Sequence, residues 1–412
     1  MKRLPALLSA AALAAGSAAA GPPADDPYEG FLALARCLAL ARERFVETNS
    51  WDTLAQTAID GFFEALDPYS RYLDCDMFED LARDDRGELL GVGIVAEERD
   101  GRPVVSWPMP GSPAFRAGVR MGDEIEKVDG ARCEDLGFEG AMDALRGPEG
   151  SWVELDVAHA DGVRERLRVR RAELRVPTVQ SARTLPGGVA CLAVTQFGET
   201  TAAELAVALA RLRADPAGPP RALVLDLREN PGGLLEQAVR AAGLFLPAGT
   251  LVASTRGRVP AVDDREFRTA ADGPCRDLPL AVLVNEETAS AAELVAAALR
   301  DAGRARLVGA HTFGKASVQS FFDIPERPGA TAKITTAHYY TPKGELVHGV
   351  GLEPDLAVPQ TADELWLATL RRVAETHPEL AATNAVNRFA DAPDRPLEAA
   401  ADLLRVPAAA AE

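Results

Sequence analysis

The sequence predicts a multidomain α/β protein, in which an N-terminal helical segment and a β-rich domain precede a core of alternating strands and helices. Three observations support this fold class. The 412 residues exceed what one hydrophobic core usually holds. The spacing of apolar residues changes from helical to strand-like near Gly87, and strands alternate with helices from Gly188 onward. The hydrophobic content of 47% and charged content of 26% are typical of soluble folded proteins.

The first twenty residues have the layout of a secretory signal peptide. Lys2 and Arg3 precede an apolar run over residues 4–15, and three small alanines end at Ala20. The alternative is a membrane-anchoring helix, but a bilayer span needs about 20 apolar residues. We therefore expect cleavage after Ala20 and an exported mature protein in the periplasm or outside the cell.

The next two segments differ in their periodicity. Residues 28–83 carry apolar side chains at helical spacing, as in Phe31, Leu32, Ala35 and Leu38, and predict a small helical domain. Residues 87–170 contain short β-type runs separated by Gly, Pro and Asp, and predict a compact β-rich domain.

The third segment, residues 171–360, predicts an α/β sheet with crossover helices. Apolar runs predict strands at 189–195, 222–227 and 280–284, and helices at 202–214, 234–244 and 290–302. Further strands are expected at 318–324 and 331–340, followed by a helix at 363–375. The Ala-, Glu- and Pro-rich composition of the end predicts that residues 361–412 form this C-terminal helix and a peripheral tail.

Composition narrows the choice of partners. The chain has 62 acidic and 44 basic residues, and its formal charge of -18 disfavours nucleic acid and anionic lipid. The five cysteines lack the paired spacing of zinc sites, so no metal or cofactor is expected. For Cys37 and Cys75 two possibilities stay open, a disulfide bridge or buried free thiols. We expect a polypeptide partner.

Two strand-to-helix junctions carry the candidate chemistry, since reacting groups of α/β sheets gather there. One is Asn230-Pro231-Gly232-Gly233 and the other spans residues 288–293. Ser290 stands at a predicted helix start, where free backbone N–H groups and the helix dipole stabilise an oxyanion. The structural alternative is a capping box between Ser290 and Glu293.

A nucleophilic serine needs a base, and Lys315 is the candidate. None of the five histidines forms a recognisable nucleophile motif with an acidic partner. Lys315 is flanked by small residues that allow close approach of another segment, and Gln319 is placed to hydrogen-bond its amine. To act as a base, the lysine needs its pKa lowered from about 10.4 by roughly 3 units, or about 4 kcal/mol.

Two alternatives exist for Lys315. It could be a solvated lysine in a turn, or the lysine of a phosphate-binding loop over residues 309–315. Ala316 stands where such a loop needs a hydroxyl for magnesium, and the following residues alternate like a strand instead of opening a helix. The sequence therefore disfavours a nucleotide site.

Taken together, these segments resemble a known family, the carboxy-terminal processing proteases, also called tail-specific proteases. The resemblance runs from about residue 66 to residue 355, and the order and spacing of its motifs make it specific. These motifs are Leu66-Asp67-Pro68-Tyr69-Ser70-Arg71-Tyr72-Leu73, Gly91-Val92-Gly93-Ile94, Gly111-Ser112-Pro113-Ala114, Ala117-Gly118-Val119, Gly122-Asp123, Asp226-Leu227-Arg228-Glu229-Asn230-Pro231-Gly232-Gly233, the Ser290 and Lys315 segments, Tyr339-Tyr340-Thr341-Pro342 and Gly351-Leu352-Glu353-Pro354-Asp355.

The resemblance implies a serine endopeptidase with a Ser-Lys dyad on a ClpP/crotonase-like core. In this sequence Ser290 would be the nucleophile, Lys315 the base and Gln319 the residue that orients the lysine. The backbone N–H groups of Gly233 and Ala291 would form the oxyanion hole. The resemblance implies neither a metal nor a cofactor.

Two positions depart from the family pattern. The family often has serine where this chain has Thr288 and Ala292. Neither change removes the implied chemistry, although both lie beside the helix start.

The β-rich domain resembles a PDZ domain, which adds a peptide strand to a sheet edge and binds its terminal carboxylate through backbone amides. Here the peptide-binding residues would be Leu90, Gly91, Val92 and Gly93. The implied substrates are unfolded or flexible C-termini of exported or envelope proteins, and an activating adaptor or a homo-oligomer is left open.

Other functions remain as alternatives. One is a noncatalytic peptide-binding scaffold on the same fold, and another is a β-rich domain without a ligand. A chymotrypsin-like protease with a PDZ domain would need a His/Asp/Ser set ahead of that domain, which the sequence lacks.

Overall fold

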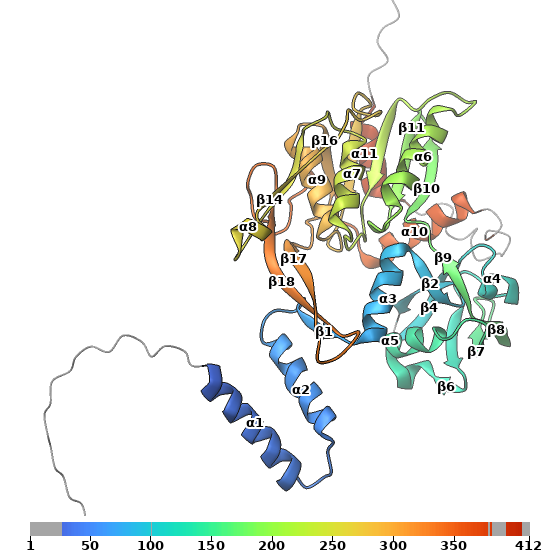
Figure 1. Ribbon diagram of the computed structural model, residues 1–412. Coiled ribbons are helices and arrows are strands. Elements are labelled where there is room, and N and C mark those ends of the chain that lie inside the picture. The colour runs from blue at the N-terminus through green and yellow to red at the C-terminus, as the bar shows by residue number, and fades with distance from the viewer. Residues whose placement is uncertain (1–26, 100, 378–379, 381–392, 406–412) are drawn as a thin grey trace, which may run out of the picture. The chain divides into compact units, whose positions relative to one another are not determined.

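The computed structural model describes residues 27–99, 101–377, 380 and 393–405, so the expected signal peptide lies outside the described residues. The chain divides into two compact units, residues 1–68 and 69–412 (Figure 1). Within the described residues no helix is long and apolar enough to cross a bilayer.

The first unit contains two helices, α1 (Pro27–Arg44) and α2 (Trp51–Glu64). Ser50 begins α2, because its hydroxyl accepts a hydrogen bond from the Thr53 N–H at 3.0 Å. We expected the helical domain to continue to residue 83. Instead, residues after Pro68 belong to the second unit, where β1 (Arg71–Leu73) pairs with a strand of the core and α3 (Cys75–Arg86) follows.

The β-rich domain begins at β2 (Glu88–Gly91), which pairs with β9 (Ala172–Arg175) at the domain's end. Its main sheet has the order β3-β4-β5-β7-β8, so β3 is an edge strand. Alternate residues of β7, such as Val153, Leu155 and Val157, are buried in the domain core. The elements are β3 (Ile94–Arg99), β4 (Arg102–Pro108), α4 (Pro113–Ala117), β5 (Glu124–Val128), β6 (Ala131–Arg132), α5 (Cys133–Leu145), β7 (Trp152–Ala158) and β8 (Arg164–Arg170).

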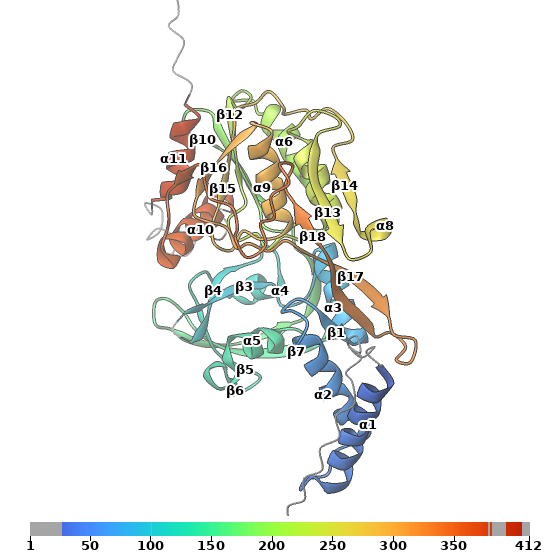
Figure 2. The same ribbon diagram turned by 90° about the vertical axis from the view of Figure 1, so that its left-hand side faces the viewer.

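The core sheet has the strand order β10-β11-β12-β15-β16-β19, with β10 antiparallel and the others parallel. The inner strands β11, β12 and β15 are buried along their whole length and are apolar on both faces, as expected for a covered parallel sheet. Val282 packs on one face with α6, α7 and α9, while Leu283 packs on the other with α11 (Figure 2). The elements are β10 (Val179–Leu185), β11 (Val189–Val194), α6 (Thr201–Arg213), β12 (Ala222–Asp226), α7 (Leu235–Gly243), β15 (Leu280–Val284), α9 (Ala291–Asp301), β16 (Ala305–Gly309) and β19 (Leu356–Ala357).

A second, antiparallel sheet lies in the same unit. It has the order β1-β18-β13-β14, and β17 also pairs with β18. Tyr72 of β1 pairs with Ala332 of β18, which brings the segment after Pro68 beside residues far along the chain. The remaining elements are β13 (Leu251–Gly257), α8 (Pro260–Asp263), β14 (Arg265–Arg268), β17 (Ser317–Asp323) and β18 (Thr331–Tyr340).

The C-terminal part corrects one expectation. The predicted helix at 363–375 is α10 (Ala362–Thr376), but a further helix, α11 (Arg395–Leu403), follows in the segment expected to be peripheral. Leu397 and Ala400 of α11 are buried in the core against the sheet. Composition did not reveal this, because the apolar face of so short a helix is only a few residues wide.

The five cysteines are free thiols. Cys133, Cys191 and Cys275 are buried, whereas Cys37 and Cys75, the two considered for a bridge, are exposed. Burial raises the pKa of the Cys191 thiol to about 12, so this thiol stays protonated at neutral pH.

Candidate active site

The two junctions predicted to carry the chemistry follow adjacent parallel strands, β12 and β15, and their loops are joined by hydrogen bonds. The Ala289 N–H donates to the carbonyl oxygen of Asn230 at 2.9 Å. The Thr288 hydroxyl donates to the carbonyl oxygen of Leu227 at 2.8 Å. Thr288, one of the two departures from the family pattern, therefore connects the two loops.

Ser290 lies directly before α9 in a strained backbone conformation. Its φ is 56° and its ψ is -119°, values that a residue with a side chain adopts at a cost. The Ser290 N–H donates to Glu293 at 2.9 Å, and the predicted capping box between these two residues is present. A cap of this kind needs no positive φ. The strain therefore distinguishes Ser290 from an ordinary helix-capping serine.

The buried carboxylate of Glu293 links the Ser290 and Lys315 segments. One of its oxygens, Oε2, accepts the backbone N–H groups of Ser290 and Lys315, each at 2.9 Å. The other, Oε1, accepts the Thr312 hydroxyl at 2.5 Å and the Gly314 N–H at 2.9 Å. Burial raises the pKa of Glu293, although these hydrogen bonds oppose the rise. Sequence reasoning had given Glu293 only the role of a helix cap.

Lys315 lies in the loop between β16 and β17, and its side chain is half-buried. Burial lowers the pKa of Lys315 below that of an exposed lysine, which is the direction a general base requires. Its Nζ lies 4.6 Å from the centroid of the Tyr69 ring. Among the described residues, no hydrogen bond joins Lys315 Nζ to Ser290 or to Gln319.

Gln319 lies on β17, in the strand that follows the Lys315 loop. Its amide nitrogen donates to the hydroxyls of Ser317 at 2.9 Å and Thr335 at 3.1 Å. The side chain is therefore fixed by the second sheet, and its action on Lys315 stays a prediction.

The Gly232-Gly233 turn runs against the backbone of the Ser290 segment. Both glycines have positive φ, 105° and 126°. A Cβ atom on Gly232 would stand 2.7 Å from Ser290 Cβ and 2.9 Å from the Ala291 nitrogen, so only glycine fits here. Within the described residues, the N–H groups of Gly233 and Ala291 have no hydrogen-bond acceptor. Two unpaired donors next to a serine are suited to binding an oxyanion.

The Asn230 side chain fixes this turn through hydrogen bonds at both ends of its amide. It is fully buried, its side-chain nitrogen donates to the carbonyl oxygen of Val194 at 2.8 Å, and its side-chain oxygen accepts the Gly232 N–H at 2.9 Å. Because both ends of the amide are bonded, the turn is fixed relative to strand β11.

The predicted peptide-binding residues lead into the edge strand β3. Leu90 and Gly91 end β2, where they pair with β9. Val92 is buried in the core of the β-rich domain, and the Gly93 carbonyl accepts hydrogen bonds from the Met109 N–H and the Ser112 hydroxyl. On its other side β3 pairs with no strand among the described residues. This leaves a free sheet edge at the position where a peptide strand could be added.

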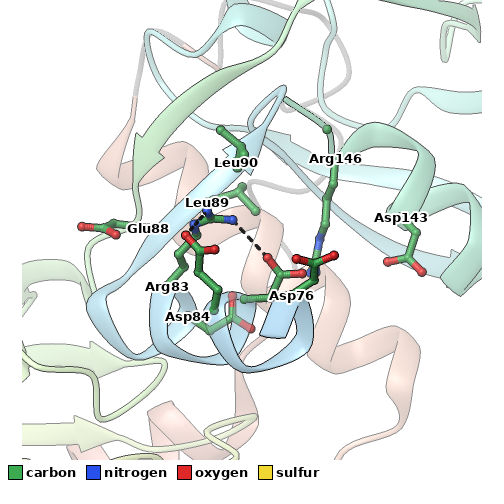
Figure 3. Close-up of a pocket in the computed structure, with 11 residues that line it drawn as sticks. Asp76, Arg83, Asp84, Glu88, Leu89, Leu90, Asp143 and Arg146 are labelled. Atoms are coloured by element: carbon green, nitrogen blue, oxygen red, sulfur yellow. Dashed lines mark hydrogen bonds and ion pairs between the residues drawn. The ribbon is translucent and has the colours of Figure 1, made fainter. Parts of the chain in front are cut away.

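A pocket of about 520 Å³ is lined by Leu89 and Leu90 of β2, by side chains of α3 and by the end of α5 (Figure 3). Its charged lining has two arginines, Arg83 and Arg146, and six carboxylates. None of the proposed catalytic residues lines it. The described residues also contain no group of three or more His, Cys, Asp or Glu side chains suited to hold a metal ion.

Comparison with known protein families gives two matches. Residues 188–358 match the model described as peptidase family S41, and residues 104–158 match the PDZ domain model. The first range contains both loops of the candidate site, and the second lies within the β-rich domain.

Individual proteins agree with this assignment. The carboxy-terminal-processing protease of Bartonella bacilliformis is 36% identical over 79% of this chain and 74% of its own length. A probable CtpA-like serine protease of Staphylococcus aureus is 32% identical over 76% of this chain, which spans 62% of that relative. Among solved structures, the photosystem II D1 C-terminal processing protease has a TM-score of 0.50 and 26% identity, with 80% of this chain and 92% of that chain covered.

A second solved structure supports the fold alone. It is a putative S41 protease from Bacteroides fragilis, with a TM-score of 0.55 and 18% identity, and the match covers 81% of this chain and 90% of that one.

Proposed function

Because the chain belongs to the carboxy-terminal-processing serine proteases of peptidase family S41, we propose that it is an endopeptidase with a Ser290-Lys315 dyad. The observation that carries the proposal is the shared contact of the two residues with Glu293. Both backbone N–H groups bind the same carboxylate oxygen, so the two side chains start from neighbouring points of the backbone.

The reaction begins when neutral Lys315 Nζ accepts the proton of the Ser290 hydroxyl as Oγ forms a bond to the substrate carbonyl carbon. The N–H groups of Gly233 and Ala291 donate to the oxyanion, and their lack of other acceptors supports this role. Lys315 then gives the proton to the leaving amine, and water releases the acyl group. Gln319, fixed on β17, orients the lysine.

The substrate class is an unfolded or flexible protein C-terminus. A peptide strand is added to the free edge of β3, and its carboxylate is bound by backbone amides around Leu90 and Gly93. The pocket that Leu90 also lines has six carboxylates against two arginines, so it disfavours the binding of a second anion. The layout of residues 1–20 supports export to the periplasm or beyond.

The dyad is tested with an unfolded reporter that ends in an apolar tail. We expect Ser290→Ala and Lys315→Ala each to lower kcat/KM by about 10³-fold or more, since members of a catalytic unit act together. Lys343→Ala is the matched control, because Lys343 is exposed and lies outside the site. If Ser290→Ala and Lys315→Ala both cleave the reporter at the wild-type rate, the dyad is disproved. A wild type that is inert on varied tails and at varied pH would favour the noncatalytic scaffold.

A further inference from the structure

The one interaction that the described residues show for the Lys315 amine is with an aromatic ring. Its Nζ lies 4.6 Å from the centroid of Tyr69, within the range of a cation–π interaction. No ion pair or hydrogen bond connects this Nζ to any described residue. A ring face stabilises an ammonium group but offers nothing comparable to a neutral amine.

Tyr69 is held at this position by the backbone on its C-terminal side. The Ser70 hydroxyl accepts the Thr335 N–H at 3.0 Å, and Arg71 of β1 pairs with Lys333 of β18. The same strand β18 pairs with β17, which carries Gln319. Tyr69 is therefore fixed to the sheet that follows the Lys315 loop.

Among the described residues, no carboxylate forms an ion pair with the Lys315 amine, and its titratable neighbours are mostly cations and histidines. Burial lowers the pKa of Lys333 on β18, the positive charges of Lys315 and Arg71 lower it further, and the Asp85 carboxylate opposes them. His348 accepts the Ala316 N–H through Nδ1 at 3.2 Å, and its ring packs against His338 at 4.9 Å and against Tyr69 at 6.3 Å between centroids.

The Glu293 carboxylate also lies in this region, and its oxygens are occupied by the four donors described above. It bonds to the Lys315 backbone and forms no ion pair with the amine. The ring of Tyr69 is thus the group that acts on the charged form of Lys315.

We propose that Tyr69 is a positioning residue for the base: its ring face holds the Lys315 ammonium in a resting position, which Nζ leaves before it accepts the Ser290 proton. This inference rests on the proposed role of Lys315. The ring stabilises the protonated form, so its removal lowers the pKa of the lysine and increases the neutral fraction at a given pH. The acid limb of the pH profile of kcat/KM then moves to lower pH.

Tyr69→Leu removes the ring but keeps an apolar side chain over the amine, whereas Tyr69→Phe keeps the ring. We expect the leucine variant to lower the pKa of Lys315 by about half a unit to one unit, and the phenylalanine variant to leave it unchanged. Tyr340→Leu is the matched control, because the Tyr340 ring faces the Arg256 guanidinium at 4.4 Å. It should leave the Lys315 titration unchanged.

The direct measurement is competitive acetylation of Lys315 by acetic anhydride across pH, read by peptide mass spectrometry in the Ser290→Ala background. The pH profile of kcat/KM in the active background is the second readout. An unchanged titration in Tyr69→Leu, or a shift to higher pH, would overturn the inference. If the leucine variant fails to fold, Tyr69→Met makes the same test.

The two proposals fail in different ways. If Lys315→Ala keeps full activity, the dyad is wrong whatever the labelling shows. If Lys315→Ala is inactive and the leucine variant titrates like the wild type, only the role of Tyr69 is wrong.

Discussion

At the scale of single residues, backbone strain separates Ser290 from the many serines that only cap helices. A positive φ for a residue with a side chain costs about 1–3 kcal/mol and persists where the surroundings enforce it. Here the surroundings are the Gly232 turn and the Glu293 carboxylate, which contact the serine from two sides.

This strain predicts a stability difference between two variants of Ser290 that both lack the hydroxyl. Ser290→Gly should have a free energy of unfolding about 1 kcal/mol larger than Ser290→Ala, since glycine adopts a positive φ freely. Urea unfolding measures the difference. At Ser320, which lies in strand β17, the same pair should show the opposite order, because glycine weakens a strand. If the glycine and alanine variants rank in the same order of stability at both positions, Ser290 is not strained.

The residues of the site were predictable to different degrees. Ser290, Lys315 and the glycine turn follow from motifs that the sequence displays. The contact between Tyr69 and Lys315 does not, because it depends on the pairing of β1 with β18, and no local pattern specifies a pairing between segments so far apart.

At the scale of elements, one carboxylate joins the start of α9 to the loop between β16 and β17. Glu293 lies at the third position of α9, so the helix fixes its direction, and its two oxygens accept four donors. The helix that follows Ser290 therefore also fixes the backbone that carries Lys315.

An amide cannot replace this carboxylate, since its nitrogen donates where the loops need an acceptor. Glu293→Gln should lower the free energy of unfolding by about 1–3 kcal/mol and, by displacing the Ser290 and Lys315 segments, lower kcat/KM by about 10²-fold. Glu286→Gln, an exposed position before the same helix, is the matched control. If the two variants match in stability and rate, Glu293 does not join the segments.

Most elements of the core followed from the sequence. The strands at 280–284 and 331–340 have the bounds predicted, and the predicted core helices lie within about a turn of α6, α7 and α9. The short strand β1 was hidden in a segment with helical spacing, because three residues are too few to show a period of two.

At the scale of the whole molecule, the last described helix completes the core. Helix α11 covers the face of the core sheet opposite α9, and a buried charge cluster ties its start to the junction after β12. Arg228 bonds to Asp226 at 2.7 Å and to Asp394 at 2.8 Å, and Arg372 of α10 bonds to Asp226 at 3.0 Å. Burial raises the pKa of Asp226, but the two arginines outweigh it and hold the pKa below its usual range.

Because α11 packs on the core sheet, a substitution in this helix, which lies outside the candidate site, should destabilise the core. Leu397→Ala should lower the free energy of unfolding by about 2–5 kcal/mol, because it leaves a cavity against the sheet. Val259→Ala, at a position that is 54% exposed, should change it by less than about 0.5 kcal/mol. Equal unfolding midpoints in guanidinium would mean that α11 is not part of the core.

The fold class was predictable from the change in periodicity along the chain, but the role of the C-terminus was not. Composition reports how polar a segment is on average, whereas burial of α11 depends on two or three side chains that meet a sheet face formed by distant strands. The same limit applies to the charge cluster, whose members come from three separate segments.

The most direct test of the central claim is to identify the residue that is acylated during turnover. Wild-type protein is mixed with an activated ester of an apolar peptide, quenched in acid and mapped by mass spectrometry. The acyl group should be found on Ser290, be absent from that peptide in Ser290→Ala, and form at least about 100-fold more slowly in Lys315→Ala. Acylation of another residue at the wild-type rate, or an unchanged rate in Lys315→Ala, would contradict the Ser290-Lys315 dyad.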